Sequence, residues 1–443
     1  MDSEQREQLA QRVLELSPAS QTEVLVTSSN SELTRFSRNT VHQNVAEADV
    51  SVRVRALIGQ RSGSASTNLL DDVSLREVVH RAEAMARLAP EDPDQPELPR
   101  GGNVVPPPGA FVTGTAHATP ELRAQMADAV FRAADDHGYW CAGFVTTESD
   151  GVTVVNSSGA RASFERTDCG VNVKMNAADS SGFGEGYHND VTQLDARDIG
   201  DVSARKAKDS AHPQTVEPGP WTVILEPAAF GELISYLADH FSAQSYEEGS
   251  SFFADGLNQK YFGDNVTIGD DYAHPLNPGM PFDYEGQPTQ RIALVENGVA
   301  RNFVTDSYYA QRLKCANTGH ALPAPNAYGP QALHLVIGPG SKPLNELISE
   351  TKRGLLITRF WYIRTVDQKK AIVTGMTRDG TFLIENGELR GGVRNMRFNQ
   401  SILEALRHCE FSNSLHRTGG YSYSLVAPAA KIEGFRFSSG TNF

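Results

Sequence analysis

Chain-breaking residues cluster between Pro90 and Gly109 more densely than anywhere else in this sequence. Seven prolines and three glycines fall within this stretch. Proline fixes φ and lacks a backbone N–H, so neither a helix nor an inner strand can run through such a segment. We therefore predict a linker over residues 91–118. It would separate an N-terminal domain of residues 1–90 from a central domain of residues 119–214, and residues 215–443 would form a C-terminal domain.

The two segments that flank this linker share a sequence pattern. Each has apolar residues at helical spacing and runs of β-forming residues, which begin near residues 23–27 and 48–58 in the first segment. We predict a two-layer α/β region with a pseudo-repeat, against the alternative that common residues agree by chance. The matching residues are Val52, Val54 and Gly63 with Val171, Val173 and Gly182 at an offset of 119, and Val79, Ala84 and Pro90 with Val202, Ala207 and Pro213 at an offset of 123.

Hairpin signals dominate the C-terminal half. Asn297-Gly298, Asp379-Gly380 and Asn386-Gly387 adjoin apolar runs, and Asn-Gly or Asp-Gly is the strongest short-range hairpin signal. Asp150-Gly151 predicts another hairpin in the central segment. The expected fold class is α+β, in which the α/β region is followed by a largely antiparallel, β-rich C-terminal domain.

The composition argues against several classes of partner. A formal net charge of −14 disfavours binding to nucleic acid or to anionic membrane surfaces. No apolar run reaches the ~20 residues of a membrane span, and no positively charged leader precedes an apolar core. The four cysteines form no CxxC pair. We expect a cytoplasmic protein with reduced thiols.

Several blocks of the sequence, spread over most of its length, resemble the TldD/PmbA family. They are Arg35 to Asn39, Val52 to Arg55 with Gly59 and Gly63, Gly354 to Thr358, and Gly380 to Glu388 with its continuation from Val393 to Ser401. The stretches from Phe360 to Arg364 and from Thr374 to Arg378 are more similar to TldE/PmbA-type chains than to TldD-type chains.

This resemblance implies a two-subunit particle that encloses a peptide-cleaving chamber. In the family, the TldD-type subunit carries H-E-x-x-x-H on a helix and a cysteine nearer the C-terminus. Two imidazoles and a thiolate hold zinc, an open position takes water, and the glutamate accepts the proton of that water.

The sequence departs from that pattern where the motif is expected. A helix predicted from Ala228 to Phe241 follows a strand from Trp221 to Leu225 and contains no His-Glu pair. Its degenerate motif region includes Ser235, Asp239 and His240, and the segment 418–424 contains no cysteine. The apolar residues of the helix have the spacing of a core-facing helix. They are Phe230, Leu233, Ile234, Leu237 and Phe241.

Other metal-ligating residues are better explained without a metal. His240 and Asp239 could form a site with Glu247 and Glu248, but we expect a solvated pair at a helix end, because zinc needs three converging ligands. Two further groupings are interpreted as chance neighbours in the sequence. They are His408-Cys409-Glu410 with His416, and His137 with Cys141. The glycines 182, 184 and 186 predict a flexible turn rather than a phosphate-binding loop.

The favoured hypothesis is a TldE/PmbA-like partner subunit with no catalytic residues, no metal and no cofactor of its own. Zinc is expected in a TldD-like partner, bound in a heterodimer or larger assembly, and the isolated chain could form a homodimer. The substrate would be an unfolded or leader peptide, gripped by strand addition. Two alternatives stay open at this point: an autonomous metallohydrolase with unrecognised ligands, and a modulator of DNA gyrase.

Overall fold

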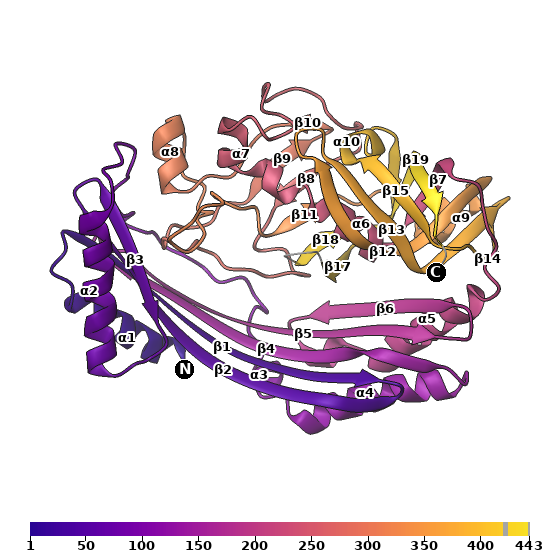
Figure 1. The fold of residues 1–443 in the computed structure, drawn as a ribbon, viewed down its shortest axis with the longest axis horizontal. Coiled ribbons are helices and arrows are strands. Elements are labelled where there is room, and N and C mark those ends of the chain that lie inside the picture. The colour runs from indigo at the N-terminus through magenta and orange to yellow at the C-terminus, as the bar shows by residue number, and fades with distance from the viewer. Residues whose placement is uncertain (420–423, 442–443) are drawn as a thin grey trace.

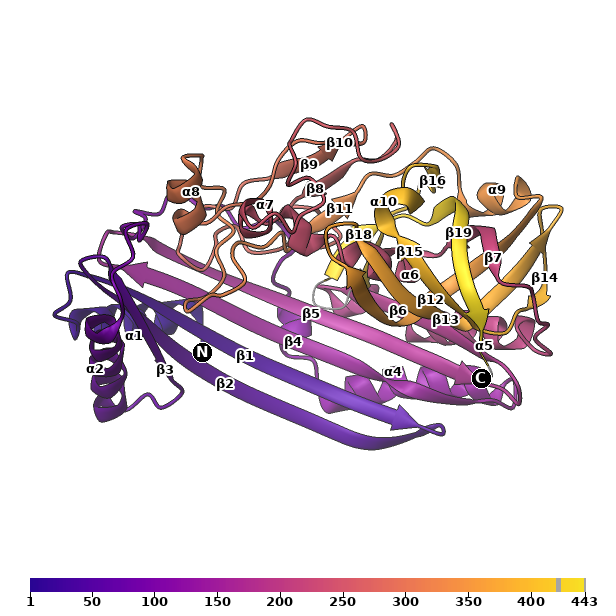
Figure 2. The same ribbon diagram turned by 45° about the horizontal axis from the view of Figure 1, so that its top comes forward.

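The computed structural model describes residues 1–419 and 424–441. A long six-stranded antiparallel sheet, in the order β3-β2-β1-β4-β5-β6, extends beneath the C-terminal domain (Figures 1 and 2). Its strands are β1 (Gln21–Ser37), β2 (Thr40–Ile58), β3 (Arg61–Thr67), β4 (Trp140–Asn156), β5 (Arg161–Asn176) and β6 (Ser181–His188). The opposite face is covered by α1 (Ser3–Glu15), α2 (Asp72–Leu88), α4 (Pro120–Asp135) and α5 (Ala196–Asp209).

The sheet contains the predicted pseudo-repeat. Strand β4 begins and ends 119 residues after β1, and the two strands pair antiparallel at the centre of the sheet. Asn30 lies opposite Ser149, the residue 119 positions later. The two halves are therefore related by a pseudo-twofold rotation about an axis normal to the sheet, which places all four helices on one face.

Close contact between helix and strand explains the repeated glycines. A Cβ atom on Gly63 would lie 2.2 Å from the backbone nitrogen of Ala86 in α2, and one on Gly182 would lie 2.5 Å from that of Ala207 in α5. The helices therefore match at an offset of 121, so the predicted offset of 123 is wrong. The predicted glycine turn at residues 182–186 is also wrong, because these residues belong to β6 and their glycines let α5 approach.

Asp150-Gly151 forms no hairpin. Both residues lie inside β4, and a Cβ on Gly151 would lie 2.2 Å from a guanidinium nitrogen of Arg6 in α1. Arg6 is 1% exposed and donates hydrogen bonds to Ser28 Oγ at 3.1 Å and Thr153 Oγ1 at 3.3 Å. Gly151 therefore makes room for the buried side chain of Arg6 and does not form a turn.

The C-terminal domain contains two mixed but largely antiparallel sheets. One has the order β10-β9-β8-β11-β18-β17, and the other β12-β7-β19-β15-β13-β14 with β16 beside β19. Their strands are β7 (Gly219–Leu225), β8 (Ile268–Asp270), β9 (Ile292–Glu296), β10 (Val299–Ala300), β11 (Leu335–Ile337), β12 (Arg353–Asp367), β13 (Ile372–Glu385), β14 (Glu388–Gly392), β15 (Met396–Ser401), β16 (Cys409–Phe411), β17 (His416–Gly419), β18 (Ser424–Ala427) and β19 (Ala430–Gly440). The short helices of this domain are α6 (Pro227–Ser235), α7 (Ala243–Glu247), α8 (Ser307–Leu313), α9 (Leu344–Ser349) and α10 (Ile402–Ala405).

Two of the three predicted C-terminal hairpins are confirmed. Asn297-Gly298 joins β9 to β10, and Asn386-Gly387 joins β13 to β14, all with positive φ. Asp379-Gly380 instead lies within β13, opposite a register shift in β12. The carboxylate of Asp379 is buried there and pairs with Lys174 at 3.0 Å and with Arg359. The positive φ of the pair therefore produces a bulge that directs Asp379 inward.

The predicted linker packs along the sheet. It contains one short helix, α3 (Thr113–Ala116), which the breaker-rich sequence did not predict. The Leu98 N–H donates to Gln21 Oε1 at 2.7 Å, and Asn156 Nδ2 donates to the Pro99 carbonyl at 2.8 Å. The domain boundaries at residues 90, 118 and 214 remain predictions, and the first two predicted domains share one sheet.

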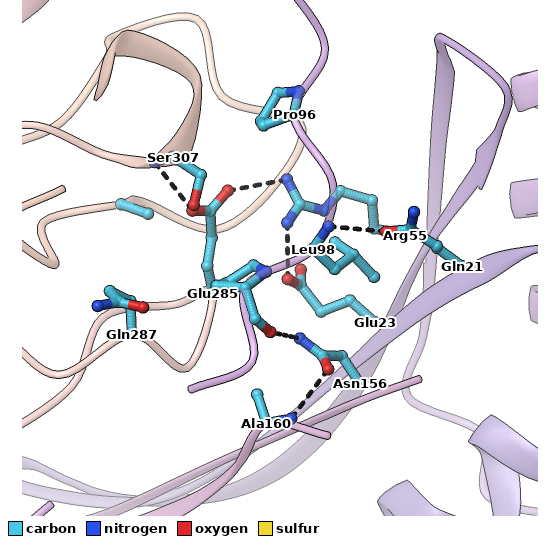
Figure 3. Close-up of polar contacts among 12 residues, drawn as sticks. Gln21, Glu23, Arg55, Pro96, Leu98, Asn156, Ala160, Glu285, Gln287 and Ser307 are labelled. Atoms are coloured by element: carbon cyan, nitrogen blue, oxygen red, sulfur yellow. Dashed lines mark hydrogen bonds and ion pairs between the residues drawn. The ribbon is translucent and has the colours of Figure 1, made fainter. Parts of the chain in front are cut away.

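A buried ion-pair network joins the sheet to the C-terminal domain (Figure 3). Arg55 of β2 contacts Glu23 of β1 at 2.7 Å and Glu285 at 3.1 Å, and Glu285 also accepts a hydrogen bond from the Ser307 N–H at 3.2 Å. Burial raises the pKa of Glu23 to about 7, although Arg55 opposes this shift. Burial and the charge of Glu285 raise the pKa of neighbouring Asp306 to about 6. The guanidinium of Arg55 is thus the counter-charge of two carboxylates, Glu23 and Glu285, at this contact.

We predict that Arg55→Met lowers the free energy of unfolding by about 3–5 kcal/mol, because two buried carboxylates lose their counter-charge. Urea unfolding of the purified chain measures the change. Arg35→Met is the matched control, since Arg35 is exposed on neighbouring β1 and should change stability by no more than about 0.5 kcal/mol. Equal unfolding midpoints for the two variants would contradict the prediction.

Candidate functional site

Helix α6 lies where the motif helix was predicted, but it is shorter. It ends at Ser235, and residues 238–241 form a 3₁₀ turn, so the predicted extension of the helix to Phe241 is wrong. The turn brings Phe241 into edge and stacked contact with Phe252 and Phe253, at ring-centroid distances of 6.0 and 6.1 Å. The predicted apolar positions are all fully buried, which confirms the core-facing pattern. They are Phe230, Leu233, Ile234, Leu237 and Phe241.

His240 is a buried acceptor rather than a solvated member of a pair. It is 1% exposed, and its Nδ1 accepts a hydrogen bond from the Phe252 N–H at 3.2 Å. Burial lowers the pKa of His240 to about 4, so the imidazole is neutral at physiological pH. Asp239 is exposed, whereas Glu247 pairs with Arg312 at 2.6 Å. The sequence prediction of a solvated histidine and acid pair is therefore wrong for His240.

No metal-binding group is evident in the described part of the chain. Within residues 1–419 and 424–441, no three or more His, Cys, Asp or Glu side chains are arranged to hold a metal ion. Cys409 lies near Asn265, His416 contacts Ser414 at 3.2 Å, and His137 stacks on Tyr139. The part of the predicted cysteine-free segment at residues 420–423 lies outside the described residues.

No placement of H-E-x-x-x-H on the predicted helix puts histidine at both motif positions. If the glutamate of H-E-x-x-x-H is placed on Glu232, Gly231 and Tyr236 stand at the histidine positions. A Cβ on Gly231 would lie 2.2 Å from Thr418 Oγ1 in β17. The Tyr236 hydroxyl donates a hydrogen bond to the Ile363 carbonyl at 2.8 Å in β12. Both positions thus contribute to packing between α6 and its neighbouring strands.

Glu232 itself lines a cavity of about 200 Å³ between α6, β12 and the first sheet. Glu185 and Tyr187 of β6 face it from the sheet, and Arg359 faces it from β12. Burial raises the pKa of Glu232 and of Glu185 to about 7, although Arg359 opposes both shifts. The Tyr187 hydroxyl donates to Glu185 Oε2 at 3.3 Å. The sequence did not single out Glu185, because docking of the two domains brings it to α6.

The acidic cavity beside α6 can hold and exchange protons near neutral pH. Carboxyl groups with a pKa near the working pH are suited to accept or donate a proton. The guanidinium of Arg359 is held by its Nε bond to Asp379 Oδ2 at 2.9 Å and lies 4.2 Å from the centre of the Phe183 ring. It therefore presents a fixed positive charge to the two glutamates.

A second cavity, of about 350 Å³, lies between the sheet and the C-terminal loops. Its wall includes His320 and His334, whose ring nitrogens lie 3.3 and 3.6 Å from Asp270 Oδ1. Burial opposes ionisation of Asp270, but the two imidazoles outweigh it and hold the pKa of Asp270 below its usual value. Phe164 and Phe282 supply apolar wall. No sequence spacing pointed to this cluster, since its members come from three separate segments.

Three family models match this chain, one in each of the three domains predicted from the sequence. The family models described as the PmbA/TldA metallopeptidase domain 1, central domain and C-terminal domain match residues 22–86, 116–211 and 218–439. The chain therefore belongs to the PmbA/TldD metallopeptidase family. No helix in the described residues is long and apolar enough to cross a membrane.

Individual relatives agree with this family and fold. The metalloprotease PmbA homolog of Haemophilus influenzae is 26% identical over 413 residues, covering 87% of this chain and 86% of the relative. The zinc metalloprotease TldD homolog of Saccharolobus solfataricus is 26% identical, over 49% of this chain and 50% of the relative. The crystal structure of TldE from Thermococcus kodakarensis superposes with a TM-score of 0.89 at 20% identity, covering 98% of this chain and 99% of that one, so the two share a fold.

We predict that Glu232→Gln removes a pH dependence of stability. The pKa of Glu232 is raised from 4.5 to about 7 in the folded chain, so the stability from its protonation is present below pH ~4.5 and is lost as pH rises through ~7. Between pH 5 and 8 the natural chain should lose about 2–3 kcal/mol more than the variant, measured by urea unfolding. Glu77→Gln, at an exposed position of α2, should not alter the pH profile. Parallel profiles for Glu232→Gln and the natural chain would refute the prediction.

Proposed function

We propose that this chain is the TldE/PmbA-like partner subunit of a cytoplasmic metallopeptidase complex that degrades or processes unfolded peptides. A TldD-like subunit holds the zinc and the two chains form a heterodimer or a larger assembly. The observation that carries the proposal is the lack of any His-Glu pair in the sequence, together with the packing of α6, where Gly231 contacts Thr418 and the hydroxyl of Tyr236 is bonded to Ile363.

Zinc chemistry explains why this observation matters. A catalytic zinc needs three protein ligands and an open position for water. Helix α6 offers Glu232 but no imidazole, and burial raises the pKa of this glutamate to about 7. The name of the Saccharolobus solfataricus relative places zinc in a TldD homolog of the same family. These findings support a division of roles in which the partner binds the metal and this chain contributes walls of the peptide chamber.

The first test of this proposal is metal content. We predict that the purified chain retains no stoichiometric zinc after dialysis, because paired imidazole and thiolate ligands are needed for tight binding. Elemental analysis measures zinc per chain. One zinc per chain that is lost on replacement of His240 or His320 would favour an autonomous metallohydrolase instead.

The second test is activity in the assembly. We predict that the chain alone cleaves no peptide, whereas a mixture with a TldD-like partner from the same organism digests unfolded peptides and stops when a chelator is added. Replacing the glutamate of the partner's H-E-x-x-x-H should abolish cleavage. The exposed Asp239→Ala variant should leave it unchanged. Cleavage by this chain without any partner would place the catalytic residues here and refute the proposal.

A further inference from the structure

One outer edge of the long sheet has no neighbouring strand. Strand β2 pairs with β1 along almost its whole length, but β3 covers only Val52–Ile58. Residues 43–51, which we call the open edge, therefore have no strand on their outer side. No backbone hydrogen bond joins them to described residues outside β1. Nine residues of strand span about 30 Å.

The pseudo-twofold supplies an internal comparison. The equivalent outer edge of β5, at residues 162–168, also lacks a strand because β6 begins to pair only at Cys169. The chain's own segments cover it: the Thr167 N–H donates to the Ala110 carbonyl at 2.9 Å, and Phe164 is buried in a cluster with Phe282. The outer edge is thus covered by other segments of the chain at residues 162–168, in the second half of the sheet. It is uncovered by any described segment at residues 43–51, in the first half.

The open edge has only part of the usual protection. Exposed edges in natural sheets commonly carry charged side chains, above all lysine, or a proline or bulge that hinders pairing with another chain. Residues 43–51 contain no lysine, arginine or proline; their two charges are acidic, and a register shift between β1 and β2 lies just before them, beside His42. Their side chains are exposed or half-buried throughout. A second strand could therefore add to this edge without first displacing any described segment.

The charges on the open edge indicate what it would bind. Val45, Glu47 and Asp49 alternate onto one face, opposite to the face on which Val52 and Val54 pack against the helices. Neither Glu47 nor Asp49 forms an ion pair with a described residue. Two carboxylates separated by one residue match two cationic side chains that are also separated by one residue on an added antiparallel strand.

We propose that the open edge binds an extended basic peptide segment by strand addition, with an Arg-x-Arg or Lys-x-Lys pair placed opposite Glu47 and Asp49. Main-chain hydrogen bonds along β2 hold the segment, and the acidic pair selects its charge. The inference deepens the proposed function, because it names where this subunit holds an unfolded peptide. It rests on the proposed function in one respect: the ligand is taken to be a peptide.

The test measures binding to the full chain without a partner subunit. The probe is a fluorescent ten-residue peptide of alternating valine and threonine with a central Arg-x-Arg pair, and anisotropy gives its Kd. Glu47→Lys with Asp49→Lys should weaken binding by about tenfold or more. N-methylation of alternate peptide residues should weaken it about as much, because it removes main-chain donors. Glu7→Lys with Glu77→Lys makes the same charge change on exposed helix positions and should have a smaller effect.

Hydrogen exchange locates the bound peptide. Amides within residues 43–51 should exchange more slowly when the peptide is bound, while residues 162–168 should be unaffected. Binding that leaves residues 43–51 unprotected, binding indifferent to N-methylation, or no binding of the basic peptide would each overturn the inference. Assembly with the partner and zinc-dependent cleavage are measured separately, so a failure here is distinguishable from failure of the proposed function.

Discussion

The guanidinium of Arg55 is one of the buried charges that fix how the C-terminal domain lies on the sheet, and Asp379 paired with Lys174 is another. Apolar surfaces alone tolerate small shifts, and Leu25, Val154 and Phe282 make such a contact beside the network. A buried charge does not tolerate them, because an unpaired guanidinium or carboxylate in a dry interface costs several kcal/mol. Arg55 meets Glu23 from its own sheet and Glu285 from the other domain. The Arg55–Glu23 pair joins neighbouring strands of the sheet, whereas the Arg55–Glu285 pair forms only when the two domains are in register.

That register also creates the acidic cavity beside α6. Glu185 is on the sheet and Glu232 is on α6, so neither is in a cavity until the domains dock. The raised pKa values of both glutamates follow from the burial that docking produces. Stability and the candidate site are thus coupled: a change that loosens the Arg55 contact should also hydrate the cavity and return these carboxyl groups toward their ordinary pKa.

The two halves of the sheet bury an arginine in different ways. Arg6 of α1 packs on Gly151, whereas Arg123 of α4 pairs with Glu32, which is the residue 119 positions before Gly151. The pseudo-repeat therefore conserves the backbone but not the side-chain chemistry. This is why its glycines and valines were detectable in the sequence, while Asp150-Gly151 was misinterpreted as a turn. Local patterns predicted the strands, the apolar face of α6 and two hairpins. They could not predict Glu185 beside Glu232, or Asp270 between two histidines, because tertiary docking assembles those sites.

The packing around α6 determines what it would take to introduce a metal site there. Gly231 allows α6 to lie against Thr418, and the Tyr236 hydroxyl ties the end of the helix to β12. Histidine at position 231 would clash with β17 unless Thr418 also became smaller, and histidine at 236 would give up the bond to Ile363. A thiol ligand would be a further change. Each substitution alone costs packing or hydrogen bonding and gains no complete ligand set. Single steps toward zinc binding at these two positions are therefore unfavourable in this chain.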